Sequence, residues 1–142
     1  MSNTIVPLEL INLNDDGFHL LVEVVVFGQS FYAVLDTGAS KTVFDKATVE
    51  KHKIDGVLMA SDKLSAGLGT NTMESHTIII PMLKIGKLKL KNFEAAVLDL
   101  STINQAYSAL NLPAIIGVLG GDILYSHRAN INYKRLRLKL FK

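Results

Sequence analysis

The chain has 142 residues, no cysteine and a formal net charge of +2 at pH 7; 49% of its residues are hydrophobic and 20% are charged. This length and composition predict one folded domain over residues 1–142, and they exclude a disordered chain and a disulfide-stabilised scaffold. The first residues, MSNTIVPLELI, lack the basic and long apolar stretches of a secretory signal, and the apolar stretch AIIGVLGG is too short to span a bilayer. We therefore expect a cytoplasmic protein without membrane contact.

Most of the sequence alternates polar and apolar residues with the period of two that is typical of strands. In chain order, the predicted strands cover residues 4–13, 18–27, 31–35, 77–85, 87–98 and 114–119, followed by a terminal hairpin over 129–141. The predicted helices cover 46–53 with Asp45 as its cap, a segment that begins at Ser101 or Thr102 and ends before Pro113, and 122–127. The polar, glycine-bearing stretch 61–76 is assigned to no element. The pattern predicts a mostly β protein with two or three short helices.

Lysine and arginine residues are concentrated in two segments, LKIGKLKLK and RLRLKLFK, where they alternate with leucine or isoleucine. The alternation places most of these charges on one face of a strand. A solvated strand face that resists aggregation explains the pattern. Nucleic-acid binding is the alternative, but the segments lack the interleaved series of aromatic residues that would stack on bases. We therefore expect no nucleic-acid partner.

An acid, a hydroxyl and a glycine directly follow the apolar strand 31–35, in the sequence YAVLDTGASKTVF. The strand delivers Asp36 to the place where the core meets a cleft, and a carboxylate there needs hydrogen bonds or a partner charge. The Thr37 hydroxyl can bond to neighbouring backbone, and Gly38 allows its amide to approach the carboxylate. Ala39 is small enough for a second copy of the loop to pack nearby. An ordinary polar turn explains the tripeptide, but not the residues on either side of it.

Other chemistries find little support in the sequence. The four histidines show no His-Glu-x-x-His or other close spacing of ligands, so we expect no metal and no other cofactor. The usual nucleophiles are missing, since the chain has no cysteine and no Gly-x-Ser-x-Gly. There is also no Gly-x-x-x-x-Gly-Lys segment to bind phosphate.

The segment AVLDTGAS resembles the active-site motif of the retropepsin-like aspartic proteases. Three later segments resemble elements of that family in the same order: AGLGT at 66–70 the flap, VLGGDIL at 118–124 the hydrophobic-hydrophobic-glycine element with its helix, and ANINYKRLRLKL the closing hairpin. The resemblance covers roughly residues 18–140 and is greatest for single-domain bacterial and cellular members, including the protease-like domain of DNA-damage-inducible proteins. It implies a retropepsin-like acid-protease barrel with two or three short helices.

The resemblance also implies roles for individual residues. The catalytic residues would be Asp36, Thr37 and Gly38. Support for the active-site loop would come from Ala39, Ser40, Val118, Leu119 and Gly120. A flap over the substrate would contain Gly67, Leu68 and Gly69.

The chain departs from the viral members of that family in three ways. Gly121 stands where viral members carry an arginine that braces the active-site loop. The triplet Ile115-Ile116-Gly117 is a second match to the hydrophobic-hydrophobic-glycine pattern, so the register of this element has two solutions. The segment 99–113 is longer than its viral counterpart.

An aspartic protease needs two carboxylates, one to accept a proton from water and one to donate a proton to the scissile carbonyl oxygen. The chain supplies one Asp-Thr-Gly, because neither Asp99 nor Asp122 is followed by Thr-Gly or Ser-Gly. A homodimer with its two-fold axis between two copies of Asp36 provides the second carboxylate. The resemblance thus implies a homodimeric aspartic endopeptidase that cleaves extended peptides or proteins.

Two alternatives stay open at this point. One is a non-catalytic module that retains the fold and captures extended peptides by strand addition. The other is a structural dimer whose basic strands contact an acidic partner. If two copies of the C-terminal strand paired at a dimer axis, their like charges would face each other, so we expect that strand to pair mainly within its own chain.

Overall fold

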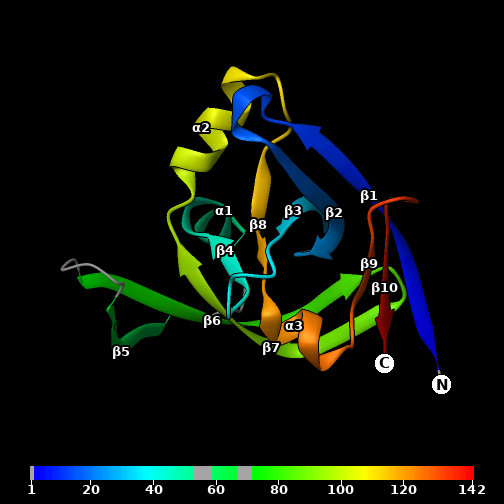
Figure 1. The fold of residues 1–142 in the computed structure, drawn as a ribbon. Helices are drawn as coiled ribbons and strands as arrows, with labels where there is room; N and C mark the ends of the chain where they lie inside the picture. Colours follow the sequence, from blue (N-terminus) through cyan, green and yellow to red (C-terminus); the bar gives the residue numbers. More distant parts are fainter. Residues whose placement is uncertain (1, 53–58, 67–71) are drawn as a thin grey trace.

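A computed structural model describes residues 2–52, 59–66 and 72–142, with side chains described outside 59–66 and 72–75. Within these residues the fold is mostly β, with three short helices and one 3-10 turn (Figure 1). The strands are β1 Asn3–Asn12, β2 Phe18–Val26, β3 Gln29–Leu35, β4 Val43–Asp45, β5 Met59–Ala66, β6 Thr72–Ile85, β7 Leu88–Leu98, β8 Ile115–Leu119, β9 Asn130–Asn132 and β10 Arg137–Phe141. The helices are α1 Lys46–Lys51, α2 Ser101–Ala109 and α3 Gly121–Ser126, and the 3-10 turn η1 is Asn14–Asp16.

Six of the strands close into a barrel. They pair in the order β6-β7-β4-β8-β3-β2, and β2 pairs again with β6 through Val25 opposite Lys84 and Val26 opposite Leu83. Most neighbours are antiparallel, but β3 pairs with β8 and β4 pairs with β7 in parallel. Parallel strands end at the same edge of a sheet. The loop after β3 and the helix after β8 are therefore brought together.

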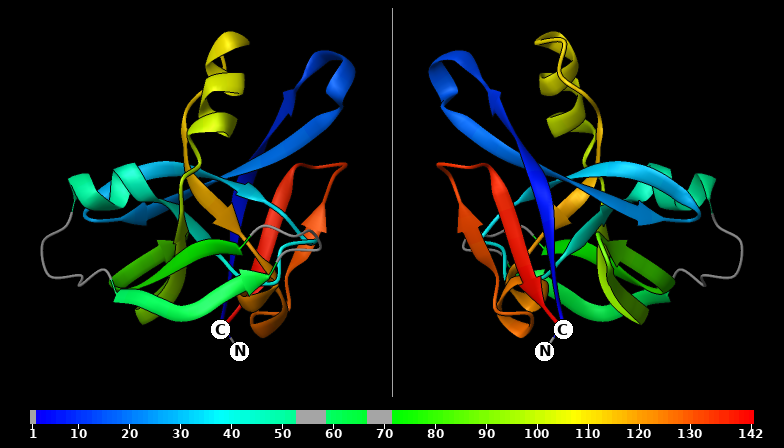
Figure 2. Two further views of the ribbon diagram at one scale, coloured as in Figure 1. Left: turned by 90° about the vertical axis from the view of Figure 1, so that its left-hand side faces the viewer. Right: turned by 90° about the vertical axis from the view of Figure 1, so that its right-hand side faces the viewer.

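The remaining sheet is built by both ends of the chain. β1 pairs with β2 through residues 8–12 and with β10 through residues 3–7, and β9 lies beyond β10. The N- and C-terminal residues lie side by side (Figures 1 and 2), and the Lys142 amide donates a hydrogen bond to the Ser2 carbonyl oxygen. The basic C-terminal strand is therefore paired on both sides by strands of its own chain, which is the pairing expected from its charges.

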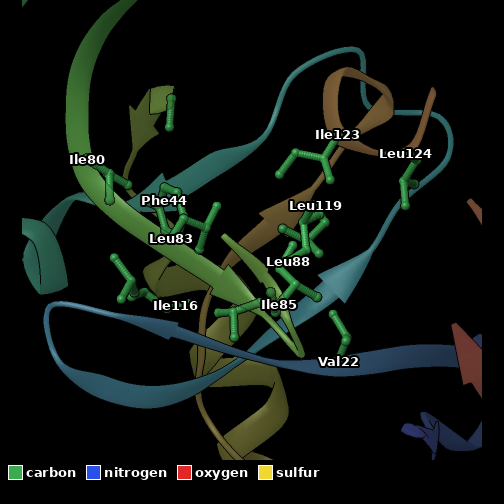
Figure 3. Packing of buried hydrophobic residues seen from close by; sticks show 14 of the residues in the cluster. Val22, Phe44, Ile80, Leu83, Ile85, Leu88, Ile116, Leu119, Ile123 and Leu124 are labelled. Carbon is green, nitrogen blue, oxygen red and sulfur yellow. The ribbon is translucent and has the colours of Figure 1, made fainter. Parts of the chain in front are cut away.

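The core fills the barrel with aliphatic side chains and one large aromatic residue. Phe44, Leu83, Ile116 and Leu119 are among its fully buried members and point toward one another inside the barrel (Figure 3). Burial of such side chains contributes roughly 1.5–3 kcal/mol each. The strand β1 shows the predicted alternation, with every second residue from Thr4 to Leu8 buried.

A second, smaller cluster holds α2 against the sheet. Tyr107 of α2 packs there with Leu21, Val34 and Ile115. The Asn104 side chain adds two hydrogen bonds, accepting from the Ile115 amide at 2.8 Å and donating to the Ile115 carbonyl oxygen at 3.2 Å. The long segment 99–113 therefore lies at the start of β8, whereas the loop after β3 lies at its end.

Several expectations about individual elements are confirmed, and others are wrong. Asp45 caps α1 as predicted, since its Oδ2 accepts hydrogen bonds from the Thr48 amide and hydroxyl. The N-cap position of α2 is occupied by Leu100, which provides no side-chain cap, and not by Ser101 or Thr102. One residue earlier, Asp99 Oδ1 accepts from the Ser101 amide at 2.9 Å, a local contact that an aspartate commonly makes with the amide two residues on.

Two strands were missed. β4 has three residues, which is too short for a period of two to be recognised. β5 has the sequence MASDKLSA, whose polar composition does not predict a strand, and it pairs with β6. Within the described parts of the chain, no helix is long and apolar enough to cross a membrane.

Candidate active site

The Asp-Thr-Gly loop begins where β3 ends. Ala33 and Val34 of β3 are buried, the strand ends at Leu35, and Asp36 is the first residue after it. The Asp36 amide continues the ladder to β8 by donating a hydrogen bond of 3.0 Å to the Leu119 carbonyl oxygen. The backbone of Asp36 is thus fixed by the barrel, while its side chain is exposed in the single chain.

The loop is also tied internally. The Gly38 amide donates to Asp36 Oδ1 at 3.0 Å, and the Ala39 amide donates to the Asp36 carbonyl oxygen at 3.1 Å. A Cβ atom at Gly38 would lie 3.3 Å from Asp36 Oδ1, tighter than an ordinary contact. These contacts agree with the prediction that the glycine amide points at the carboxylate, and they restrict the rotamers of Asp36.

The residues expected to support the loop are found next to it. Val118 and Leu119 pair in parallel with Val34 and Leu35, which places the end of β8 beside the start of the loop. Gly120 lies so close to the loop that a Cβ atom there would be 2.7 Å from the Lys41 carbonyl oxygen. This close approach explains the glycine.

The second hydrophobic-hydrophobic-glycine triplet occupies a different place. Gly117 lies in β8 opposite Phe44, and a Cβ atom there would come within 2.1 Å of the Val43 carbonyl oxygen. The loop therefore contacts the Val118-Leu119-Gly120 triplet, and Gly117 instead permits β4 to pack closely against β8. This decides between the two registers that the sequence allowed.

The other expected residues are placed as follows. Ser40 is exposed, and Thr37 lies at the tip of the loop. Gly121, which has no side chain to brace the loop as an arginine would, instead donates its amide to the Ala39 carbonyl oxygen at 2.7 Å. Gly67, Leu68 and Gly69 lie outside the described residues, so the flap stays a prediction; the strands before and after them, β5 and β6, pair antiparallel with Ala66 opposite Thr72.

Sequence analysis missed a hydrogen-bonded pair of polar residues next to the loop. The side chain of Thr42 is completely buried, and its amide and hydroxyl both donate to the carboxylate of Asp122 in α3. The two residues are 80 positions apart, so no local pattern links them. The available signals were an acid in the first turn of a predicted helix and a threonine at the start of an apolar segment.

A groove runs beside the loop, along α3 and β9. Its volume is about 610 Å³, and its walls include Thr37, Tyr125, Arg128 and Ile131. Tyr125 is 87% exposed in the single chain. An exposed tyrosine and an arginine next to the loop form the kind of surface that is enriched in protein contacts.

The chemistry available at this site is that of a carboxylate. Asp36 is an exposed acid on a rigid loop, and a positioned carboxylate acts as a general base or acid. Among the residues that the structure describes, no group of three or more His, Cys, Asp or Glu side chains is arranged to hold a metal ion.

Comparisons with solved structures place this fold among retropepsin-like proteins. The chain is similar to a retropepsin-like aspartic protease from Rickettsia conorii, with 22% identity, a TM-score of 0.58, and coverage of 98% of this chain and 89% of that one. It is also similar to the retroviral protease-like domain of Ddi1 from Leishmania major, with 19% identity, a TM-score of 0.58, and coverage of 86% and 87%. The EIAV protease in complex with the inhibitor HBY-793 gives 20% identity, a TM-score of 0.57, and coverage of 79% and 90%.

These likenesses confirm the predicted fold, a mostly β retropepsin-like barrel with short helices. No curated protein sequence matches the chain significantly. A family profile described as "Aspartyl protease" matches residues 22–123, which include the second half of β2, the Asp-Thr-Gly loop, the strands β3 to β8 and the first residues of α3. The chain belongs to the aspartyl protease family.

Proposed function

We propose that the chain is an aspartic endopeptidase whose active site forms when two copies bring their Asp36 carboxylates together. The observation that carries this proposal is the geometry of the loop. Asp36 is held by the Leu119 carbonyl oxygen through its backbone and by the Gly38 amide through its side chain, yet it remains exposed in the single chain. A rigid acid at the surface is suited to meet an identical acid across a two-fold axis.

In the proposed dimer, the two carboxylates share one proton because two close negative charges are unfavourable. The ionised carboxylate accepts a proton from a water molecule, which attacks the scissile carbonyl carbon. The protonated carboxylate donates its proton to the carbonyl oxygen, which gives a tetrahedral intermediate. Transfer of a proton to the amide nitrogen then allows the C–N bond to break. Thr37 and Gly38 hold the geometry of the pair, and the substrate is an extended peptide.

The experiment that tests this proposal varies the concentration of the chain. Cleavage of a diverse peptide library is followed by mass spectrometry, and the rate on a selected peptide is measured from nanomolar to micromolar protein. The specific activity should fall on dilution, because each chain carries half of the catalytic pair. A specific activity independent of concentration in a chain that sediments as a monomer would contradict the dimeric site.

Mixing with an inactive variant gives a second, independent test. Asp36→Asn is nearly isosteric but cannot act as a base, so it should abolish cleavage while leaving the circular dichroism spectrum unchanged. Excess Asp36→Asn chains should suppress wild-type activity beyond simple dilution.

A statine-type peptide should inhibit cleavage and a chelator should not. Loss of activity with a chelator would instead support a metal-dependent reaction.

A further inference from the structure

The carboxylate of Asp122 receives a dense set of hydrogen bonds from the far end of the active-site loop. Its Oδ1 accepts from the Thr42 hydroxyl at 2.7 Å and from the Thr42 amide at 3.0 Å, and its Oδ2 also accepts from that amide at 3.0 Å. The Ile123 amide donates to Oδ1 at 2.9 Å. Hydrogen bonds to an ionised acceptor are stronger than neutral ones.

Thr42 also links Asp122 to the residue that follows β8. Its side-chain oxygen accepts a hydrogen bond of 3.1 Å from the Gly120 amide while its hydroxyl hydrogen is donated to Asp122. A hydroxyl has one hydrogen to donate, so these two contacts determine its orientation. Because Thr42 is fully buried, each group left without its partner would carry a desolvation cost.

The loop 36–42 is thus tied to residues 119–122 by contacts of two kinds. Two of the ties are backbone to backbone: the Asp36 amide to Leu119 and the Gly121 amide to Ala39. Such bonds need no particular side chain. The other ties need particular side chains: the Asp122 carboxylate accepts from the Thr42 amide and hydroxyl, and the Thr42 side-chain oxygen accepts from the Gly120 amide.

We propose that Asp122 is a positioning residue for Asp36, acting through Thr42 and Gly120 to hold the Asp-Thr-Gly loop in its reactive geometry. This inference rests on the proposed function of Asp36. Asp122 does not take part in the proton transfers, since its oxygens are occupied by Thr42 and Ile123. Its removal loosens the far end of the loop and so allows Asp36 to move relative to its partner.

A carboxylate is specifically required in this arrangement. In Asp122→Asn, the amide oxygen in place of Oδ1 retains the bonds to the Thr42 hydroxyl and to Ile123, but an NH2 group replaces Oδ2. That group would then face the Thr42 amide, so that two donors meet. The asparagine side chain therefore keeps the bonds to the Thr42 hydroxyl and to Ile123 but loses the favourable contact between the position of Oδ2 and the Thr42 amide.

The variants Asp122→Asn and Thr42→Val are compared with Thr42→Ser, which retains the hydroxyl and the amide. Asp16→Asn makes the same chemical change as Asp122→Asn at an exposed position of η1 and serves as the matched control. Small displacements of a catalytic group cost up to about 100-fold in rate, so we expect kcat to fall about tenfold or more in Asp122→Asn and Thr42→Val, with KM within about twofold. Thr42→Ser and Asp16→Asn should stay within about twofold of wild type in both parameters.

A double variant separates positioning from a general loss of stability. Asp122→Asn disrupts the contact with the Thr42 amide and Thr42→Val removes the contact with the Thr42 hydroxyl, and both contacts belong to one junction, so their effects on kcat should be less than additive in the combined protein. Additive effects, or wild-type kcat in a folded Asp122→Asn protein, would overturn the proposal. If Asp122→Asn fails to fold, the comparison of Thr42→Val with Thr42→Ser tests the same tie.

Amide hydrogen exchange provides a readout that does not need activity. The Gly38 and Gly120 amides should exchange faster in Asp122→Asn than in wild type, while amides of the distant α2 should be unchanged. Faster exchange spread evenly over the protein would contradict a local positioning role. If the wild type cleaves no peptide at all, the proposed function fails, and this measurement still decides whether Asp122 orders the loop.

Discussion

Asp36 and Leu119 are joined across two parallel strands, with the Asp36 amide donating to the Leu119 carbonyl oxygen at 3.0 Å. The candidate acid therefore follows β3, and its backbone is held by the neighbouring strand β8. Gly120 comes directly after that carbonyl and packs closely against the backbone of the loop. Substitutions where the loop meets the end of β8 should therefore affect both the position of Asp36 and the stability of the barrel.

Gly120→Ala should disable the site and destabilise the fold. Its Cβ atom would lie 2.7 Å from the Lys41 carbonyl carbon and oxygen and 2.8 Å from the Ala39 carbonyl oxygen, all of which are backbone atoms that cannot rotate away. Overpacking of this kind costs about 1–3 kcal/mol in the free energy of unfolding. Urea denaturation and kcat/KM measure the two effects.

Gly121→Ala is the matched control for that substitution. At this neighbouring glycine the nearest atom would be 3.5 Å from the new Cβ, an ordinary contact. The free energy of unfolding should change by less than about 0.5 kcal/mol. Equal tolerance of alanine at both positions would mean that the close approach at Gly120 does not exist in solution.

Tyr107→Phe should reduce stability without touching the candidate site. The Tyr107 hydroxyl is hydrogen-bonded to His19 Nδ1 at 2.5 Å, which links α2 to β2, and burial raises the pKa of Tyr107 above its ordinary value. Loss of one such bond costs about 1 kcal/mol in the free energy of unfolding. Tyr133→Phe, at a residue that is 66% exposed, should change it little. Urea denaturation of both variants compares them, and equal losses would exclude a specific role for the His19 contact.

Asp99 should make stability depend on pH in the acidic range. Hydrogen bonds from the Ser101 backbone and side chain, together with the charge of Lys46, hold the pKa of Asp99 below its ordinary value. The folded chain thus binds fewer protons at Asp99 than the unfolded chain does. The stabilisation of the folded chain by ionised Asp99 is complete above the unfolded-state pKa of about 3.9. It is lost as the pH falls through the lowered folded-state pKa.

Asp99→Asn, which does not titrate, isolates this effect. We expect wild type to be more stable than Asp99→Asn near neutral pH, and the difference in urea midpoint to shrink as the pH falls below about 4. A difference that is constant from neutral to strongly acidic pH would show that the charge of Asp99 does not stabilise the start of α2.

Peptide cleavage should be faster in mildly acidic than in alkaline solution. A pair of aspartates that shares one proton loses its general acid when the pH rises and both become ionised. The measurement is kcat/KM between mildly acidic and alkaline pH, at a protein concentration where dimerisation is complete by sedimentation. A rate that continues to rise above neutral pH would contradict the shared-proton mechanism.

Much of this protein follows from local features of its sequence. The period of two predicts the long strands, because alternate side chains of a strand point to opposite faces. Asp45 is recognisable as a helix cap because its acceptor and the Thr48 amide are three residues apart. The position of Asp36 directly after a buried strand is likewise a local property, and it was predicted together with the amide of Gly38.

Only the tertiary structure decided the features that join distant segments. The sequence offered two hydrophobic-hydrophobic-glycine triplets, and the parallel pairing of β3 with β8 assigns Gly120 to the loop and Gly117 to the packing of β4. Likewise, no local pattern links Thr42 to Asp122, because a hydrogen bond between residues 80 positions apart exists only after the barrel has closed. Closure of the barrel, through β2 and β6, depends on burying side chains of six strands in one core. The free energy of this burial comes from all six strands together, so no single segment of the chain predicts it.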